Sequence, residues 1–374
     1  MRVVIDDKIP FIKGILEPFA EVVYFPGSKI DKHIVKEADA LIVRSRTLCD
    51  KNLLEGSRIK FVATATIGYD HIDTNWCEAN GIEWTNAAGC NSSSVQQYMA
   101  STLVYLSKKL NFKFEDRTLG VIGIGNVGKK IVRLAEILGM RVVLNDPPLA
   151  RQRGPCGYVS LDGLIQEADI ISLHVPLNNI GEDKTYHLIG ELKLKKFNKS
   201  TIFINTSRGE VVDNLALKNA LKSDVLKNAV LDVWENEPDI DLELMKMLDI
   251  ATPHIAGYSA DGKANGTAMS VRALSKYFNL GIDNWFPENL PLPSSSLIVI
   301  DAKNKTLQET ISEVIEKTYE VKNDDERLRN APQDFEKQRG NYPVRREFQA
   351  FTINLKNGSA ELVERLKELG LKVN

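Results

Sequence analysis

The chain has 374 residues, of which 43% are hydrophobic and 26% charged, and its formal net charge is −2. This composition is typical of a globular protein, and so small a charge gives no reason to expect binding to nucleic acid or to an anionic membrane. No apolar run is long enough to cross a bilayer and Met1–Pro10 has no signal-peptide pattern, so we expect a cytoplasmic protein. The cysteines form no CxxC pair, so we expect reduced thiols and no metal site; they are Cys49, Cys77, Cys90 and Cys156.

The first segment alternates short apolar runs with more polar stretches, which is typical of a small α/β layer with a parallel sheet. A helical stretch is expected at Ile9–Phe19. Ligands of such sheets bind beyond the carboxyl ends of the strands, so Arg44, Ser45 and Arg46 after the third run and Thr66 after the fourth are candidate ligand contacts. The expected strands are Arg2–Ile5, Val22–Phe25, Ala40–Val43, Lys60–Thr64 and Ile82–Thr85.

A helix from Ser92 to Lys109 leads into the clearest motif of the chain. The apolar run Leu119–Ile124 enters Gly123-x-Gly125-x-x-Gly128, and an apolar pattern at helical spacing continues to Gly139. This order predicts a βαβ unit that binds a dinucleotide. The first glycine allows a tight turn, the second lets the backbone approach a pyrophosphate at the helix N-terminus, and the third lets helix and strand pack closely.

A second apolar run, Val142–Leu144, ends in Asp146, at about the expected 20-residue distance from the glycines. A carboxylate there accepts hydrogen bonds from ribose hydroxyls and repels a 2′-phosphate, which predicts NAD rather than NADP. Arg151 and Arg153 follow and could receive a 2′-phosphate, but we interpret them as a solvated loop.

The dinucleotide-binding pattern continues through further alternating elements and is followed by a long helix at Lys263–Leu280. We expect that helix to return to the first domain. The substrate domain is therefore predicted to be discontinuous, residues 1–92 and 258–286, with the NAD domain, residues 93–257, inserted. The continuing elements are strands Asp169–Leu173, Thr201–Asn205, Ala229–Val233 and Ile250–Thr252 and helix Asn214–Leu221.

Three polar residues stand just beyond strands of this second sheet: Arg208, Glu237 and His254. Oxidising a hydroxy acid requires a cation for the carboxylate, a base for the hydroxyl proton and a group that orients the base. A guanidinium fork suits the first task. A histidine suits the second, with a carboxylate behind it for the third. We therefore expect these three residues to be catalytic.

At these residues the chain resembles the D-isomer-specific 2-hydroxyacid dehydrogenases, through GIGNVGKKIV, NTSRGEVVD, LDVWENEP and TPHIAGYS. LIVRSRT, KFVATATIGYDHID, AGYSADGKANGT and NYPVRREF resemble members that act on phosphorylated hydroxy acids. The resemblance implies a phosphorylated 2-hydroxy acid as substrate. It implies that Arg208 and Glu237 form the active-site pair and that His254 is the proton donor. It implies substrate contacts at Ser45, Thr66 and Tyr258, and cofactor contacts at Asn126, Val127, Asp146, Thr206, Ser207, Arg208, Asp232 and Gly257.

Residues 287–374 follow a stretch rich in proline and serine and are predicted to form a small α+β module. The fold class is thus α/β, with two Rossmann-like or flavodoxin-like parallel-sheet domains and this C-terminal dimerisation module. An exposed strand edge in the module suits pairing with a second copy across a two-fold axis. We expect one or both of Arg345 and Arg346 to reach the substrate phosphate in the partner's active site. The expected elements are strands Leu297–Ile300 and Phe348–Leu355 and helices Leu307–Tyr319 and Ala360–Leu369.

Two alternatives stay open. A 3-phosphoglycerate dehydrogenase could carry a C-terminal module that binds a regulatory amino acid. An NAD-sensing corepressor could keep the same fold and the same three polar residues without turnover.

Overall fold

Every residue from Met1 to Asn374 is described by the computed structural model, and the chain divides into two units. The first unit contains Met1–Asn91 and Ser259–Pro291, and the second contains Ser92–Tyr258 and Leu292–Asn374. The chain thus leaves the first unit, builds most of the second, and returns. None of its helices combines the length and apolar character that a membrane span requires.

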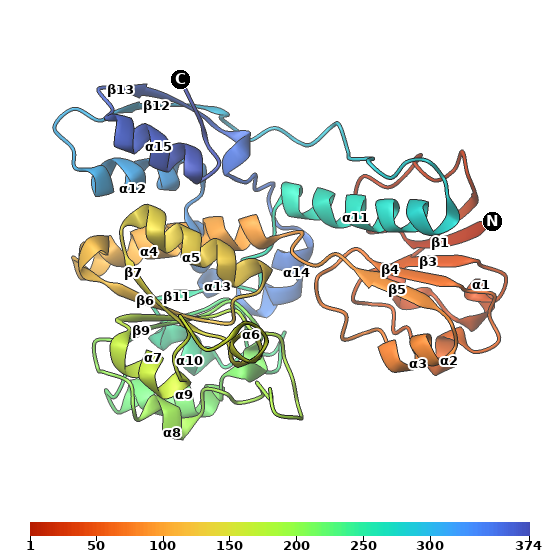
Figure 1. Ribbon diagram of the computed structural model, residues 1–374, viewed down its shortest axis with the longest axis horizontal. Coiled ribbons are helices and arrows are strands. Elements are labelled where there is room, and N and C mark those ends of the chain that lie inside the picture. The colour runs from red at the N-terminus through yellow and green to blue at the C-terminus, as the bar shows by residue number, and fades with distance from the viewer. The chain divides into compact units, whose positions relative to one another are not determined.

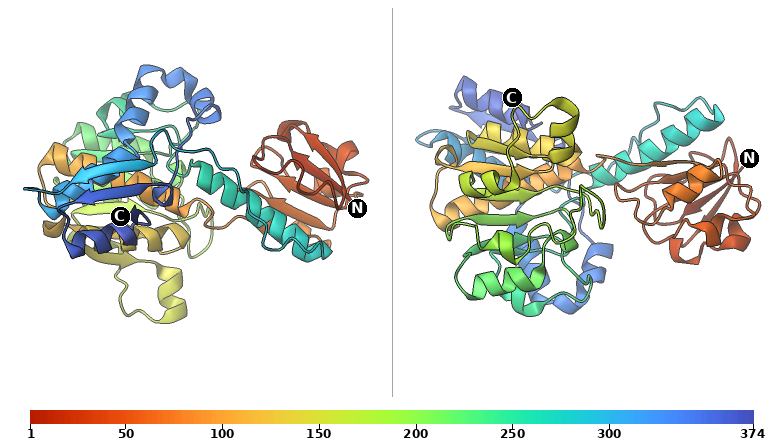
Figure 2. Two further views of the ribbon diagram at one scale, coloured as in Figure 1. Left: turned by 90° about the horizontal axis from the view of Figure 1, so that it is seen from above. Right: turned by 60° about the horizontal axis from the view of Figure 1, so that its bottom comes forward.

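The first unit is a five-stranded parallel sheet in the order β2-β1-β3-β4-β5. Its central strands are covered on both faces, which explains their unbroken apolar sequences. Three short helices cover one face, and α11 (Ala260–Phe278) covers the other through Val271 and Leu274 (Figure 2). The remaining elements are β1 (Arg2–Asp6), β2 (Glu21–Phe25), β3 (Ala40–Val43), β4 (Phe61–Thr64), β5 (Glu83–Asn86), α1 (Lys32–Val35), α2 (Lys51–Leu54) and α3 (Thr74–Ala79).

The helix predicted at Ile9–Phe19 is wrong, because this segment forms a series of turns. Phe11 and Gly14 have positive φ angles of 63° and 86°, which a right-handed helix cannot contain. Pro10 and Pro18 remove two backbone donors as well. The apolar residues that suggested a helix do pack into the core, since Ile9, Ile12 and Leu16 are buried. They are brought there by turns and not by a helix.

The second unit is built on a six-stranded parallel sheet in the order β11-β10-β9-β8-β6-β7. The chain begins at β6 (Thr118–Ile122), adds β7 (Arg141–Asn145), and crosses to β8 (Ile170–Leu173) on the other side of β6. The connections after β6 and β8 therefore diverge, which makes the crevice where such sheets bind ligands. The other strands are β9 (Ile202–Asn205), β10 (Asn228–Leu231) and β11 (Ile250–Ala251).

Helices cover both faces of this sheet (Figure 1). One face is covered by α4 (Ser92–Leu110) and α5 (Asn126–Leu138), and the other mainly by α7 to α10. The latter are α7 (Leu161–Glu167), α8 (Glu191–Leu194), α9 (Asn214–Lys222) and α10 (Leu242–Met247), with α6 (Pro147–Arg153) after β7.

The C-terminal residues form a three-stranded parallel sheet, β12-β13-β14, which shares a hydrophobic core with α4 and α5. Helix α12 (Leu307–Thr318) packs on α4, and α13 (Val321–Asn330) packs on α4 and β11. The predicted strand at Phe348 begins only at Thr352, because Phe348–Ala350 is a 3-10 turn. The other elements are β12 (Leu297–Asp301), β13 (Thr352–Lys356), β14 (Lys372–Val373), α14 (Phe335–Gly340) and α15 (Ala360–Glu368).

Candidate active site

The glycine-rich turn between β6 and α5 has the geometry that a pyrophosphate needs. Gly123 has φ 88°, and a Cβ there would lie 2.6 Å from the His174 carbonyl oxygen. A Cβ at Gly128 would lie 1.9 Å from the Gly123 carbonyl oxygen. A Cβ at Gly125 would meet no atom within 4 Å, and no side chain caps α5 there. The chain itself thus requires the first and third glycines, whereas the second leaves open space before free helix amides.

Asp146 lies where β7 ends, beside this turn. One carboxylate oxygen accepts a hydrogen bond from the Ile124 amide at 2.6 Å, and the other from the Leu149 amide at 2.9 Å. Each oxygen can accept a further bond, so the residue can still hold ribose hydroxyls. The expected loop at Arg151 and Arg153 is wrong, because both residues lie in helix α6. Both are exposed, and Arg151 forms ion pairs with Glu182 and Asp183.

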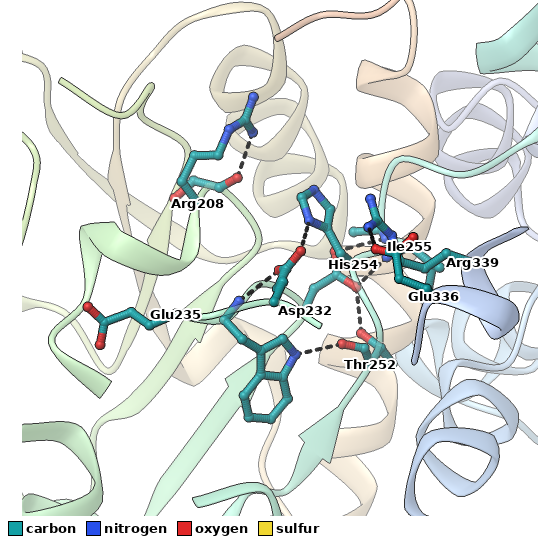
Figure 3. A network of polar contacts seen from close by, with 12 residues as sticks. Arg208, Asp232, Glu235, Thr252, His254, Ile255, Glu336 and Arg339 are labelled. Atoms are coloured by element: carbon teal, nitrogen blue, oxygen red, sulfur yellow. Dashed lines mark hydrogen bonds and ion pairs between the residues drawn. The ribbon is translucent and has the colours of Figure 1, made fainter. Parts of the chain in front are cut away.

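His254 and Glu237 are brought together at the carboxyl edge of the same sheet. The His254 Nδ1 and Glu237 Oε2 atoms are 2.8 Å apart, and Glu237 Oε1 accepts the Trp234 amide at 3.0 Å (Figure 3). A carboxylate only accepts, so Nδ1 carries the proton and Nε2 is left for a substrate hydroxyl. Burial alone would raise the pKa of Glu237. The hydrogen bond and charge of His254, the Trp234 amide and the charge of Arg339 outweigh burial and lower that pKa.

The neighbouring carboxylate, Glu235, has a different environment. It accepts hydrogen bonds from His187 at 2.7 Å and from the Asn214 amide at 2.9 Å, and so faces away from His254. Trp234 between the two is buried and donates its indole N–H to the Thr252 carbonyl. This tryptophan therefore packs beneath the His254 loop.

Arg208 reaches this edge from the loop after β9. Its Nη1 atom donates to the Ser207 carbonyl at 2.8 Å, and Figure 3 shows Arg208 apart from His254. A Cβ at Gly209 would lie 1.9 Å from the Trp234 carbonyl oxygen, so only glycine lets these two loops pack together. Arg208 and Glu237 thus stand on loops that touch each other.

The other expected cofactor contacts differ in their exposure. Thr206 is half-buried, with its hydroxyl 3.4 Å from His174 Nδ1, and Ser207 is buried, with its hydroxyl bonded to Asn205. Asp232 is only 1% exposed, and its carboxylate accepts bonds from Thr252, Ile255 and Ala256. This burial does not fit a cofactor contact by Asp232. Val127 and Gly257 are half-buried, and Asn126 is exposed.

The expected substrate residues of the first unit lie after β3 and β4. Arg44 donates to the Lys8 carbonyl at 3.3 Å, and Ser45 and Arg46 are exposed. Thr66 is half-buried, and its hydroxyl contacts Thr64 and the Gly68 carbonyl. These residues all stand at the carboxyl end of their sheet, as predicted.

Arg345 does not lie where the sequence predicts it. Its side chain is buried, with 6% of the residue exposed, and Nη2 donates to the Ala256 carbonyl at 2.6 Å. The guanidinium lies 4.6 Å from the centre of the Tyr319 ring. A phosphate in a partner subunit cannot reach it there, so the expected contact is wrong for Arg345. Arg346 is half-buried, and its carbonyl accepts a bond from Gln97.

Arg339 is a charged residue near the site that no sequence pattern singled out. It lies on α14, over the Tyr258 ring at 5.8 Å, and pairs with Glu336 at 2.8 Å. Figure 3 shows this pair beside the His254 loop, and the positive charge acts on Glu237. The sequence gives no indication of this role, because α14 is short and comes close to the site only in the folded chain.

A histidine oriented by a half-buried carboxylate, beside a turn shaped for a pyrophosphate, is the arrangement that a nicotinamide-dependent dehydrogenase needs. Fold and site together define that class. Residues 92–256 match the NAD-binding domain of the D-isomer specific 2-hydroxyacid dehydrogenases, and residues 291–370 match a domain of unknown function, DUF3410.

Relatives of known name match along almost the whole chain. A protein from Bacteroides thetaiotaomicron named erythronate-4-phosphate dehydrogenase is 47% identical over 94% of this chain and 99% of its own length. One of the same name from Pseudomonas putida is 38% identical over 99% of both. The chain therefore belongs to the D-isomer specific 2-hydroxyacid dehydrogenases, in the group that carries the erythronate-4-phosphate dehydrogenase name.

Solved structures agree on the fold. An NAD-bound 3-phosphoglycerate dehydrogenase from Entamoeba histolytica is 25% identical, with a TM-score of 0.64, and covers 78% of this chain and 99% of that one. A D-lactate dehydrogenase from Aquifex aeolicus, solved with NAD and lactic acid, is 26% identical, with a TM-score of 0.59, over 78% of this chain and 100% of that one. The chain is an oxidoreductase of this family, and its cofactor is NAD.

Proposed function

We propose that this chain oxidises 4-phospho-D-erythronate to (R)-3-hydroxy-2-oxo-4-phosphobutanoate, a step in pyridoxal 5′-phosphate biosynthesis. The observation that carries the proposal is the 2.8 Å contact between His254 and Glu237, in a chain whose relatives of this name match nearly end to end. When bound, NAD supplies the hydride acceptor.

The proposed steps assign one task to each side chain. Arg208 holds the substrate carboxylate with its guanidinium fork. His254 Nε2 removes the hydroxyl proton as the hydride leaves the same carbon, and Glu237 stabilises the imidazolium that forms. In the reverse direction, the imidazolium returns the proton. Ser45, Thr66 and Tyr258 are the proposed substrate contacts, and Arg44, Arg46 and Arg346 the proposed phosphate contacts.

The test is nicotinamide absorbance during incubation with NAD and either 4-phosphoerythronate or 3-phosphoglycerate. The proposal expects turnover with the first and little with the second. Preference for 3-phosphoglycerate would contradict it, and NAD binding without turnover of either acid would favour the corepressor. NADP should be a poor substitute, because Asp146 repels a 2′-phosphate.

We also propose a homodimer formed through the C-terminal sheet, in the cytoplasm. Strand β12 is an edge strand of that sheet, and its outward residues Leu297 and Val299 are 55% and 50% exposed. An exposed apolar edge strand is suited to pairing with a second copy.

A further inference from the structure

The loop that carries His254 has an unusual backbone. His254 has φ 55°, in the left-handed region that residues with a side chain seldom adopt. Such a conformation costs free energy and persists only where the surroundings impose it. The position of the imidazole therefore depends on what holds this loop on each side.

The sheet holds one side of the loop through Asp232. The Asp232 carbonyl accepts the His254 amide at 2.7 Å. Its carboxylate accepts the Ile255 amide at 2.8 Å, the Ala256 amide at 2.9 Å and the Thr252 hydroxyl at 2.6 Å. These bonds fix the loop's N–H groups.

The C-terminal segment, Leu292–Asn374, holds the other side of the loop through Arg345. Arg345 donates to the Ala256 carbonyl at 2.6 Å and to the Ser94 carbonyl at 3.3 Å. The rings of Tyr319 and Tyr342 lie 4.6 and 5.9 Å from the guanidinium. The hydroxyl groups of Tyr319 and Tyr342 donate to Asp324, at 2.7 and 2.6 Å. The two rings that contact Arg345 are therefore held in place.

Stability alone does not account for this arginine. Its Nε and Nη1 atoms are buried without a hydrogen-bond partner, and it forms no ion pair with a carboxylate. Burial disfavours the charge, but the two phenol side chains and the charge of Asp324 outweigh burial and raise the pKa of Arg345. The charge is thus tolerated, yet two of the three guanidinium nitrogens make no hydrogen bond. What the guanidinium does provide is a rigid contact two residues from His254.

We propose that Arg345 is a positioning residue, which sets the orientation of the His254 imidazole toward Glu237 and the substrate from within its own subunit. This inference rests on the proposed function of His254 as the base. The C-terminal segment then contributes to the active site by holding the His254 loop in position.

Arg329 provides a matched control. It also belongs to the C-terminal segment and also bridges to backbone carbonyls, those of Met245 and Leu248, both at 2.9 Å. Those carbonyls lie at the end of α10 and not in the His254 loop. Arg329 also pairs with Asp325 at 2.8 Å. Arg329→Met therefore removes a similar pair of carbonyl contacts together with an ion pair, and of the two arginines only Arg345 bonds to the His254 loop.

The experiment compares Arg345→Met, Arg329→Met and Arg345→Lys as full-length proteins with NAD. A loop shift of about 1 Å can cost about 100-fold in rate, so Arg345→Met should lower kcat by about that factor, with NAD affinity unchanged within about twofold. Its pH profile should change as well. Arg345→Lys should recover part of kcat, and Arg329→Met should keep kcat even where it lowers Tm equally.

A second readout does not require substrate. The chain has five histidines, so the ring signals in a ¹H–¹⁵N spectrum can be resolved and that of His254 assigned with His254→Gln. The signal of the Nδ1–H bonded to Glu237 should shift or broaden in Arg345→Met and stay in Arg329→Met. If Arg345→Met does not fold, Arg345→Lys carries both readouts.

An Arg345→Met protein whose kcat, pH profile and His254 signal match those of Arg329→Met would overturn the proposal. Failure of the proposed function gives a different result. Wild type would then not turn over 4-phosphoerythronate, whereas the effect of Arg345 on the His254 signal would remain measurable.

Discussion

At the residue scale, the His254–Glu237 pair should favour one direction of the reaction. Reduction needs an imidazolium, and the Glu237 carboxylate 2.8 Å away stabilises that charge. Glu237→Gln should therefore slow reduction at neutral pH by about 100-fold, and slow oxidation less. Rates in both directions across pH check this, and equal loss in both directions would show that Glu237 does not act through the charge of His254.

The same carboxylate should make stability depend on pH. The pKa of Glu237 is lowered from its ordinary value of 4.5, despite burial, by His254, the Trp234 amide and Arg339. The folded state therefore releases this proton more readily than the unfolded state does. The stabilisation is present in full above about pH 4.5 and is lost as the pH falls through the lowered folded pKa.

Glu237→Gln should thus lower the free energy of unfolding by about 1.5 kcal/mol at neutral pH, where the charged hydrogen bond is lost. The difference from wild type should shrink on acidification below about pH 4.5. Urea unfolding at several pH values measures it. Glu288→Gln is a control, because that carboxylate is exposed, and a constant difference for Glu237→Gln down to low pH would contradict the assignment.

Much of the site could be predicted at this scale, and the reason is local. Arg208, Glu237 and His254 each follow a strand of the sheet closely in sequence, so the strand pattern alone places them at one edge. Arg345 could not be placed, because the rings that bury it come from α12's end and from Tyr342, and an Arg-Arg pair on its own resembles surface charge. Arg339 was missed because it lies on the short helix α14, which reaches the site only in the folded chain.

At the element scale, the glycine-rich turn separates binding from stability. Gly125→Ala should weaken NAD binding by about tenfold or more with Tm unchanged, because the new methyl group meets no protein atom and occupies the space before the helix amides. Gly128→Ala should cost about 1–3 kcal/mol of stability, because its Cβ would lie 1.9 Å from the Gly123 carbonyl. Calorimetry of NAD binding and thermal unfolding measure the two effects. A Gly125→Ala protein that binds NAD normally would show that the cofactor does not approach this turn.

The elements found from the sequence are those whose apolar pattern is long or unbroken. Strands β3, β4, β8 and β9 are buried on both faces, and α5 has a continuous apolar stripe. Helix α13 was missed because its sequence, VKNDDERLRN, is largely polar and only Val321 and Leu328 are buried apolar residues. Its fold depends on α4 and β11, which no local pattern reveals.

At the scale of the whole molecule, the edge of the C-terminal sheet should determine assembly. Leu297→Lys with Val299→Lys places charges on the outward face of β12, where like charges would oppose each other across a two-fold axis. The double variant should be monomeric with its circular dichroism unchanged. Sedimentation velocity measures this. Leu192→Lys with Leu215→Lys is the control, because these exposed leucines lie on α8 and α9, away from the C-terminal sheet. A wild-type monomer would refute the dimer outright, and a dimeric double variant would place the interface elsewhere.

Mixed assemblies should separate the roles of the two neighbouring arginines. A dimer of one His254→Ala and one Arg345→Met subunit has no intact site if Arg345 serves its own subunit, because each site carries one lesion. Mixing these variants should therefore restore no activity.

Arg346→Ala is the counterpart, since Arg346 is proposed to reach across the interface. A mixed dimer of one Arg346→Ala and one His254→Ala subunit keeps one complete site. Random exchange makes about half of the dimers mixed, so about a quarter of wild-type activity should return. Tagged subunits that copurify establish that exchange has occurred. Recovery with Arg345→Met would assign that residue to the partner's site and overturn its role as a brace, whereas no recovery with Arg346→Ala would confine Arg346 to its own subunit.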